Sequence, residues 1–313
     1  MSYTGPELQP PQPRRPRRGP LTMAIAALVP GALLGWVVYE AVGGGGGAEH
    51  PAAAPASRTS AASSGASGNS ASPTGSAAAD AKGQSAAGPL AGKVVVIDPG
   101  HNPGNFRHTT EINRQVDIGT NKKECDTTGT STNDGYTEAR FTLDVAHRLR
   151  TLLEKQGATV KMTRDGNSPA WGPCVDERAR FGNNARADAA ISIHADGSAE
   201  GDRGFHVILP GSVHAGAADT RKIIKPSTDL GTRIADKFQR DTGEPPSNYV
   251  GKGTGLVTRT DLGGLNLSTV PKVFIECGNM RDSKDAALLT SGAWRQKAAQ
   301  GMSDGIVSFL RES

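Results

Sequence analysis

Two histidines and two glutamates of this chain have the types and positions needed for metal-assisted hydrolysis. His101 closely follows the apolar run KVVVI, His194 ends AAISIH, Glu276 ends KVFIE, and Glu138 opens a helical pattern. Two imidazoles and one carboxylate can hold zinc while leaving a coordination position open for water. A second carboxylate can then act as a general base toward that water. We therefore expect His101, Glu138 and His194 to bind Zn²⁺, with Glu276 as the catalytic base.

The spacing of these residues is weak evidence by itself. Glu138 lies 37 residues after His101, and His194 lies 56 residues after Glu138. Neither gap matches a short metal-binding motif, and a single histidine at a strand end more often caps or packs. The prediction depends instead on all four polar residues lying at element ends.

The elements that must position these side chains can be predicted from periodicity. Short β-branched runs alternate with amphipathic stretches, which indicates an α/β fold with an open, mostly parallel or mixed sheet flanked by helices. Thr137 is expected to cap a helix that Gly157 ends. Strands are expected at 93–97, 158–162, 189–194, 204–209, 255–258 and 272–276, and helices at 138–156, 174–187, 228–242 and 294–310.

The carboxyl ends of strands in an open α/β sheet form the edge where ligands bind. Three of the four candidate residues end or closely follow strands, so they can meet at that edge. A polar insert over residues 103–135 follows His101 directly. It is too long for an ordinary connection, and we expect it to restrict access to the metal.

Three cysteines are present, and their surroundings differ. Cys125 and Cys174 lie in loop-like sequence, whereas Cys277 lies inside the apolar run VFIECG and should be buried, pointing away from Glu276. We expect a Cys125–Cys174 disulfide, which would stabilise the fold by about 4 kcal/mol. No two cysteines have a short zinc-ribbon spacing.

The first 90 residues differ in composition from the rest. Residues 1–20 form a basic tail, and residues 21–39 carry no charge over roughly 29 Å of helix, enough to span a bilayer. The arginines before this segment should stay cytoplasmic, so that the chain beyond residue 42 is extracytoplasmic, in the periplasm or cell wall. Residues 21–42 are interpreted as a membrane anchor or a signal segment, with an uncleaved anchor favoured. Residues 43–90 are expected to be a disordered Gly/Ala/Ser/Pro-rich linker.

Residues 91–313 are then long enough for one catalytic domain. Six of the 35 Lys and Arg residues and four of the 31 Asp and Glu residues precede Ala91, which leaves a net charge of +2. No nucleic-acid partner is expected from so balanced a domain, since such binding needs a basic stripe. The chain also lacks a G-x-S-x-G motif, which argues against a serine hydrolase.

Four blocks of the sequence together resemble the N-acetylmuramoyl-L-alanine amidases, the zinc amidases of peptidoglycan. They are VVVIDPGHNPG, GYTEARFTLDVAHRL, AISIHADG and KVFIECGNMRDSKDAALL, and GTSTNDGY and GPCVDERA further resemble the actinobacterial members. The resemblance implies that His101, Glu138 and His194 are the zinc ligands and Glu276 the catalytic glutamate. It also implies hydrolysis of the amide between the lactyl group of muramic acid and L-alanine, with peptidoglycan or muropeptides as the partner.

Some assignments remain open at this stage. His206, Arg259 and Asn266 are candidate substrate contacts, and Asp98 either orients a metal ligand or caps its own turn. The family usually has Gly-Phe and then Ser-Asn near residues 278–282, where this chain has GNMRD. Two alternatives are kept: an inactive peptidoglycan-binding or regulatory protein on the same scaffold, and a zinc peptidase that cuts stem peptides. The catalytic domain is expected to be monomeric.

Overall fold

The fold is known from a computed structural model, which describes residues 88–166 and 168–312. The expected basic tail, the membrane segment and residues 43–87 of the expected linker lie outside the described residues. Among the helices that the structure describes, none is both long and apolar enough to cross a membrane.

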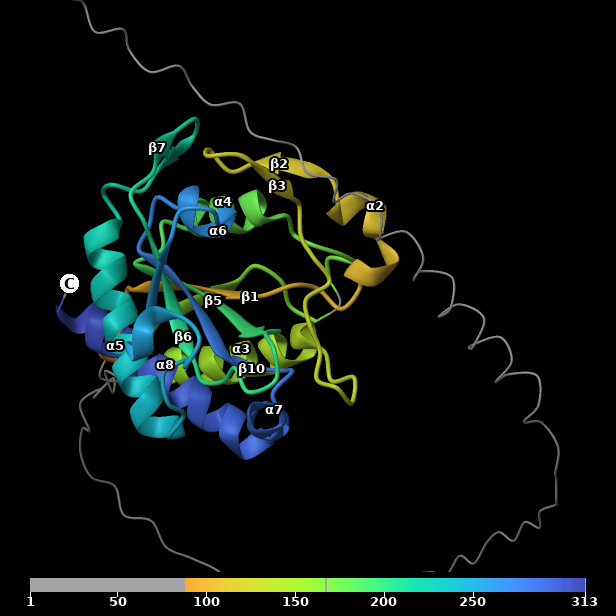
Figure 1. The fold of residues 1–313 in the computed structure, drawn as a ribbon. Coiled ribbons are helices and arrows are strands. Elements are labelled where there is room, and N and C mark those ends of the chain that lie inside the picture. The colour runs from red at the N-terminus through yellow and green to blue at the C-terminus, as the bar shows by residue number, and fades with distance from the viewer. Residues whose placement is uncertain (1–87, 167, 313) are drawn as a thin grey trace, which may run out of the picture. The chain divides into compact units, whose positions relative to one another are not determined.

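A mixed six-stranded sheet lies at the centre of the domain (Figure 1). Its strand order is β4–β1–β5–β10–β6–β9, and every neighbouring pair is parallel except β10 and β6. The strands are β1 (Val94–Pro99), β4 (Thr159–Met162), β5 (Ala189–Asp196), β6 (His206–Pro210), β9 (Leu256–Arg259) and β10 (Lys272–Asn279). The α/β fold with a mixed sheet that the sequence predicts is confirmed.

Three long helices cover one face of this sheet, namely α3 (Glu138–Lys155), α5 (Ile224–Thr242) and α8 (Gly292–Glu312). Alternate residues of the central strands, such as Ile97, Ile193 and Ile275, point into a fully buried core on this face. Cys277 belongs to this core, as expected from its position next to Glu276. Removal of this apolar surface from water is the main contribution to the stability of the domain.

The opposite face of the sheet is polar where it approaches the candidate site. Buried Asp98, Ser192 and Lys272 point to this face, which α4 (Val175–Asn184) and α6 (Gly263–Asn266) cover. The remaining elements are η1 (Asn105–Arg107), α2 (Thr109–Ile112), β2 (Gln115–Asp117), β3 (Lys122–Glu124), β7 (His214–Ala215), β8 (Ala218–Asp219), η2 (Gly251–Gly253) and α7 (Ser283–Thr290). The sheet is thus apolar on one side and carries buried charges on the other.

Several details differ from the sequence-based expectation. Leu90, assigned to the linker, is fully buried, and its N–H donates to the carbonyl of Gln156, so the folded domain begins before residue 91. Thr137 precedes α3 in extended conformation, but its side chain makes no capping hydrogen bond. Gly157 ends the helix as expected, with a positive φ of 92°. The short elements of the insert and α7 had no periodic signal long enough to predict them.

Candidate active site

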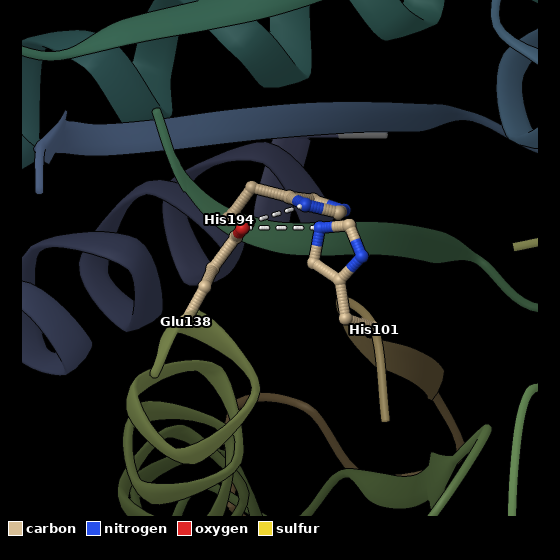
Figure 2. Close-up of side chains that lie close together, drawn as sticks. All are labelled: His101, Glu138 and His194. Carbon is tan, nitrogen blue, oxygen red and sulfur yellow. Dashed lines mark hydrogen bonds and ion pairs between the residues drawn. The ribbon is translucent and has the colours of Figure 1, made fainter. Parts of the chain in front are cut away.

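The side chains of His101, Glu138 and His194 point toward one another, as Figure 2 shows. Glu138 Oε2 lies 3.1 Å from His101 Nε2, and Glu138 Oε1 lies 3.0 Å from His194 Nδ1. One ligand atom from each residue lies within 4.8 Å of the others. The three residues therefore form a cluster that could hold a metal ion.

The donor set of this cluster, two imidazoles and one carboxylate, is one that zinc sites use. In a tetrahedral zinc site with bonds of about 2.0–2.1 Å, neighbouring donor atoms lie roughly 3.3 Å apart. The two nitrogen–oxygen distances are slightly shorter, and they run to different oxygens of Glu138, Oε2 for His101 and Oε1 for His194. The carboxylate of Glu138 is also oriented by the protein, since it accepts hydrogen bonds from the backbone N–H groups of Thr130 (2.9 Å) and Ala195 (3.2 Å).

Local backbone conformation directs His101 toward this cluster. His101 follows β1 with a φ of 56°, a left-handed conformation that is unfavourable for a residue with a side chain and is found at functional sites. Burial opposes protonation of His101, but the carboxylates of Glu138 and Asp126 outweigh it and raise its pKa to about 10. A proton and a metal ion would therefore compete for His101.

Arg164 joins the two segments that carry His101 and Glu138. This buried side chain donates from one Nη2 to the carbonyls of Gly100 (3.1 Å) and Ala139 (2.9 Å), the residues next to each ligand. Arg164 was not predicted from the sequence, although it follows strand β4 and therefore lies at the same sheet edge. Its position was the signal that could have identified it.

A second buried arginine connects the site to its carboxylate surroundings. Arg178 donates to Asp98 Oδ1 (2.7 Å), Asp126 Oδ2 (2.9 Å) and the carbonyl of His101 (3.2 Å). Arg178 and Lys272 hold the pKa of Asp98 well below its usual range, although burial acts against them. The Asp98 carboxylate is bound by the side chains of Thr163, Arg178 and Ser192, which come from other segments of the chain, rather than by its own turn.

Glu276 lies beside the cluster on the central strand β10. It is paired with His194 of β5 and with His206 of β6. After Glu276 the register with β5 shifts by one residue, so that Asn279 pairs with Asp196, which is a β-bulge at the site. Burial, together with Glu138 and Asp196, raises the pKa of Glu276 well above its usual range. Glu276 is thus suited to accept and hold a proton.

A cleft of about 350 Å³ opens over these residues. Its lining includes the three cluster residues and Glu276, together with Phe274 and Arg259. The guanidinium group of Arg259 donates two hydrogen bonds to Asp261, at 2.8 and 2.7 Å. Arg259 is thus the one predicted substrate contact that reaches the cleft in the described part of the chain.

The other two predicted substrate contacts lie elsewhere. His206 is 5% exposed, packs edge-on against Tyr249 and does not line the cleft, and burial lowers its pKa to about 4. Asn266 is buried, and its amide donates to the carbonyls of Ile118 (3.3 Å) and Thr260 (2.9 Å). Neither residue lines the cleft in this structure, because His206 is packed next to Glu276 in the sheet and Asn266 holds the insert.

The insert forms one wall of the cleft. Thr127, Gly129 and Thr130 line it, and the structure joins Cys125 to Cys174 by the disulfide predicted from the sequence. The unusual GNMRD segment has a different role: the amide of Asn279 donates to the carbonyls of Ala199 (2.8 Å) and Asp202 (2.6 Å). It holds the loop that follows β5.

Comparison with known proteins agrees with this geometry. Residues 95–308 match the family model described as N-acetylmuramoyl-L-alanine amidase. The chain is 42% identical over 226 residues to the N-acetylmuramoyl-L-alanine amidase Rv3717 of Mycobacterium tuberculosis, covering 71% of this chain and 88% of that protein. It is 25% identical to the N-acetylmuramoyl-L-alanine amidase LytC of Bacillus subtilis over 71% of this chain, but over only 36% of LytC.

Solved structures show the same relationship. The crystal structure of the N-acetylmuramyl-L-alanine amidase Ami1 from Mycobacterium smegmatis matches with a TM-score of 0.65 and 42% identity, covering 72% of this chain and 99% of that one. The apo form of Ami1 from Mycobacterium abscessus matches with a TM-score of 0.64 and 40% identity, covering 71% and 100%. The chain belongs to the N-acetylmuramoyl-L-alanine amidase family. The enzyme class expected from the sequence is therefore confirmed.

Proposed function

We propose that this protein is a zinc-dependent peptidoglycan hydrolase that cleaves the amide between the lactyl group of muramic acid and L-alanine. The observation that carries the proposal is the convergence of His101 Nε2, His194 Nδ1 and the Glu138 carboxylate beside Glu276 in one cleft. Membership of the amidase family supports the reaction and the substrate class.

The protein's own residues account for the proton transfers. A zinc ion held by His101, Glu138 and His194 would polarise the amide carbonyl and acidify water. Glu276 takes the proton that water loses as its oxygen bonds to the carbonyl carbon. Glu276 then delivers that proton to the nitrogen of L-alanine as the C–N bond breaks. The products are the lactyl carboxylate on the glycan and a peptide with a free L-alanine amino group.

Digestion of purified muropeptides tests this reaction. We expect lactyl-bearing glycan and peptides with N-terminal L-alanine, and we expect Glu276→Gln to lower the rate by about 10²- to 10⁴-fold while zinc stays bound. Glu111→Gln, at a half-buried position in α2 that does not line the cleft, is the matched control and should keep full activity. Cleavage of peptide–peptide bonds alone would indicate the zinc peptidase instead. Binding without any product would indicate an inactive scaffold.

Arg259 is the residue that we propose contacts the substrate. It lines the cleft, and its pairing with Asp261 leaves Nη1 to donate to carbonyl or carboxylate oxygens of the substrate. We expect Arg259→Met to raise KM more than it lowers kcat. Arg221 offers a matched control, because it pairs with Asp219 at 2.8 and 2.7 Å outside the cleft. Equal effects of the two substitutions would contradict the assignment.

The remaining proposals concern location and assembly. We propose that residues 21–42 direct the domain across the cytoplasmic membrane and tether it there, so that it acts on the cell wall. We also propose that the catalytic domain is a monomer. Fractionation of cells expressing the full chain, compared with a chain lacking residues 21–42, tests the tether. Light scattering of the purified domain tests the monomer. Domain recovered equally in the soluble fraction with and without this segment would contradict the tether.

A further inference from the structure

We propose that Ser192 is a positioning residue that presents the correct nitrogen of His194 to the metal, under the control of Asp98. The inference rests on the proposed zinc site. Three distances carry it: Ser192 Oγ lies 3.2 Å from His194 Nε2, 2.9 Å from Asp98 Oδ2 and 3.4 Å from the Asp98 carbonyl. These atoms form a hydrogen-bond chain from the buried carboxylate of Asp98 to Nε2 of His194, the ring nitrogen that points away from Glu138.

The direction of this chain follows from which groups can donate. A serine hydroxyl has one proton, and the two Asp98 oxygens can only accept, since the carboxylate is ionised beside two cations. Ser192 therefore donates to Asp98 and has only its lone pairs to offer His194. His194 must then donate from Nε2–H. A neutral imidazole with a proton on Nε2 has its lone pair on Nδ1, the nitrogen that faces Glu138 at 3.0 Å.

Asp98 is held so firmly that it can impose this direction. It is 1% exposed, and Oδ1 accepts from Thr163 Oγ1 (2.6 Å) and Arg178 Nη1 (2.7 Å), while Lys272 Nζ lies 3.4 Å from Oδ2. Because these partners come from three different segments of the chain, the carboxylate cannot rotate without breaking two charged contacts and the hydrogen bond from Thr163. Ser192 is itself only 1% exposed, so its hydroxyl is directed to its protein partners.

The plane of the His194 ring is fixed as well. Phe274 stacks on one face, with ring centroids 5.3 Å apart and an interplanar angle of 10°. Gly100 lies so close to the ring that any Cβ there would overlap it. With its plane set by packing, the ring retains only a flip that exchanges its two nitrogens, and the hydrogen bond to Ser192 selects between those orientations.

His101 is held by a hydrogen bond to a backbone carbonyl, which favours the opposite tautomer. Its Nδ1 lies 3.1 Å from the carbonyl oxygen of Thr127, which can only accept. His101 therefore carries its neutral-state proton on Nδ1 and turns the Nε2 lone pair to Glu138. The structure thus assigns Nε2 of His101 and Nδ1 of His194 as the two metal-facing nitrogens.

Ser192→Ala isolates the contribution of the hydroxyl, because alanine removes one buried atom and leaves Asp98 with its cationic partners. We expect the affinity for Zn²⁺, measured by competition with a chromophoric chelator, to fall by about 10- to 100-fold. Ser268→Ala is the matched control: Ser268 is equally buried and donates one hydrogen bond, to the carbonyl of Val270 at 2.8 Å, away from the cleft. Its zinc affinity should equal that of the unmodified protein.

A measurement on the unmodified, zinc-loaded protein keeps the inference testable if Ser192→Ala does not fold. Long-range ¹H–¹⁵N correlation spectra should show metal on Nδ1 and a proton on Nε2 of His194, with the reverse for His101. Metal on Nε2 of His194, or unchanged zinc affinity in a folded Ser192→Ala protein, would overturn the role of Ser192. Failure of the unmodified protein to bind zinc at all would instead refute the proposed function.

Discussion

Gly129 provides a direct test of how closely the insert approaches the metal ligands. A Cβ at this position would lie 2.8 Å from the His101 ring and 2.9 Å from Glu138 Oε2, where ordinary contacts begin at 3.4 Å. Gly129→Ala must therefore displace one or both ligands by about 0.5 Å, beyond the roughly 0.2 Å that a metal site tolerates. We expect zinc affinity to fall at least about 10-fold, as in other sites with misplaced ligands.

The glycine conformation itself must be separated from this steric effect. Gly129 has a φ of +74°, which costs an alanine about 1–2 kcal/mol. Gly135 lies in the same insert with a φ of +84°, but nothing lies within 4 Å of its added Cβ. Gly135→Ala should therefore lose the same stability, with a Tm lower by roughly 2–4 °C per kcal/mol, and keep its zinc affinity.

Two measurements on each variant decide between these effects: thermal unfolding of the metal-free protein, and zinc affinity by chelator competition. The expected pattern is a similar Tm loss in both variants, or a larger loss in Gly129→Ala, with weakened zinc binding only in Gly129→Ala. Zinc affinity of Gly129→Ala within twofold of the unmodified protein would refute the close approach of the insert to His101 and Glu138.

Three further predictions follow from the charges and the disulfide. The pKa of Glu276 is raised in the folded state, so the metal-free protein should lose stability as pH rises above about 4.5, and Glu276→Gln should remove this contribution. Urea titrations at pH 5 and pH 8 measure the loss. The same pH dependence in both proteins would contradict the raised pKa. Zinc binding at pH 7 should release a proton from His101, whose pKa is about 10 without metal, and the zinc affinity should rise with pH up to that value. Calorimetry in buffers of different ionisation enthalpy measures this proton release. Its absence would contradict the raised pKa of His101. Cys125→Ser opens a bridge between residues 49 apart and should cost up to about 4 kcal/mol, so an unchanged urea midpoint would refute a stabilising role.

Much of the fold could be predicted because its signals are local. The apolar runs that form β1, β5 and β10 are short and contain β-branched residues, which favours strands over helices. The helical spacing of Phe141, Val145 and Leu149 matches their burial in α3. The β2–β3 pair was missed because strands of three residues show almost no alternation, and α7 because eight residues make only about two helical turns.

The candidate site was predictable in its residues but not in its supports. His101, His194 and Glu276 were identified from their place at or just after strand ends, and parallel strands end at one edge. Arg164 shares the signal of a place just after a strand, whereas nothing local distinguishes Arg178 from a surface arginine, because its carboxylate partners Asp98 and Asp126 lie 80 and 52 positions away in the sequence. His206 and Asn266 were predicted to contact the substrate because the sequence does not show whether a polar side chain near a cleft points into the cleft or into the protein.

The sequence by itself therefore determined the α/β class, the four polar residues that meet at one edge and the pairing of Cys125 with Cys174. These depend on periodicity, on strand direction and on the small number of cysteines. Only the tertiary structure decided which nitrogen of each histidine faces Glu138, the bulge after Glu276 and the burial of His206. Those features depend on hydrogen bonds and packing between segments distant in the chain, and no local pattern of residues encodes them.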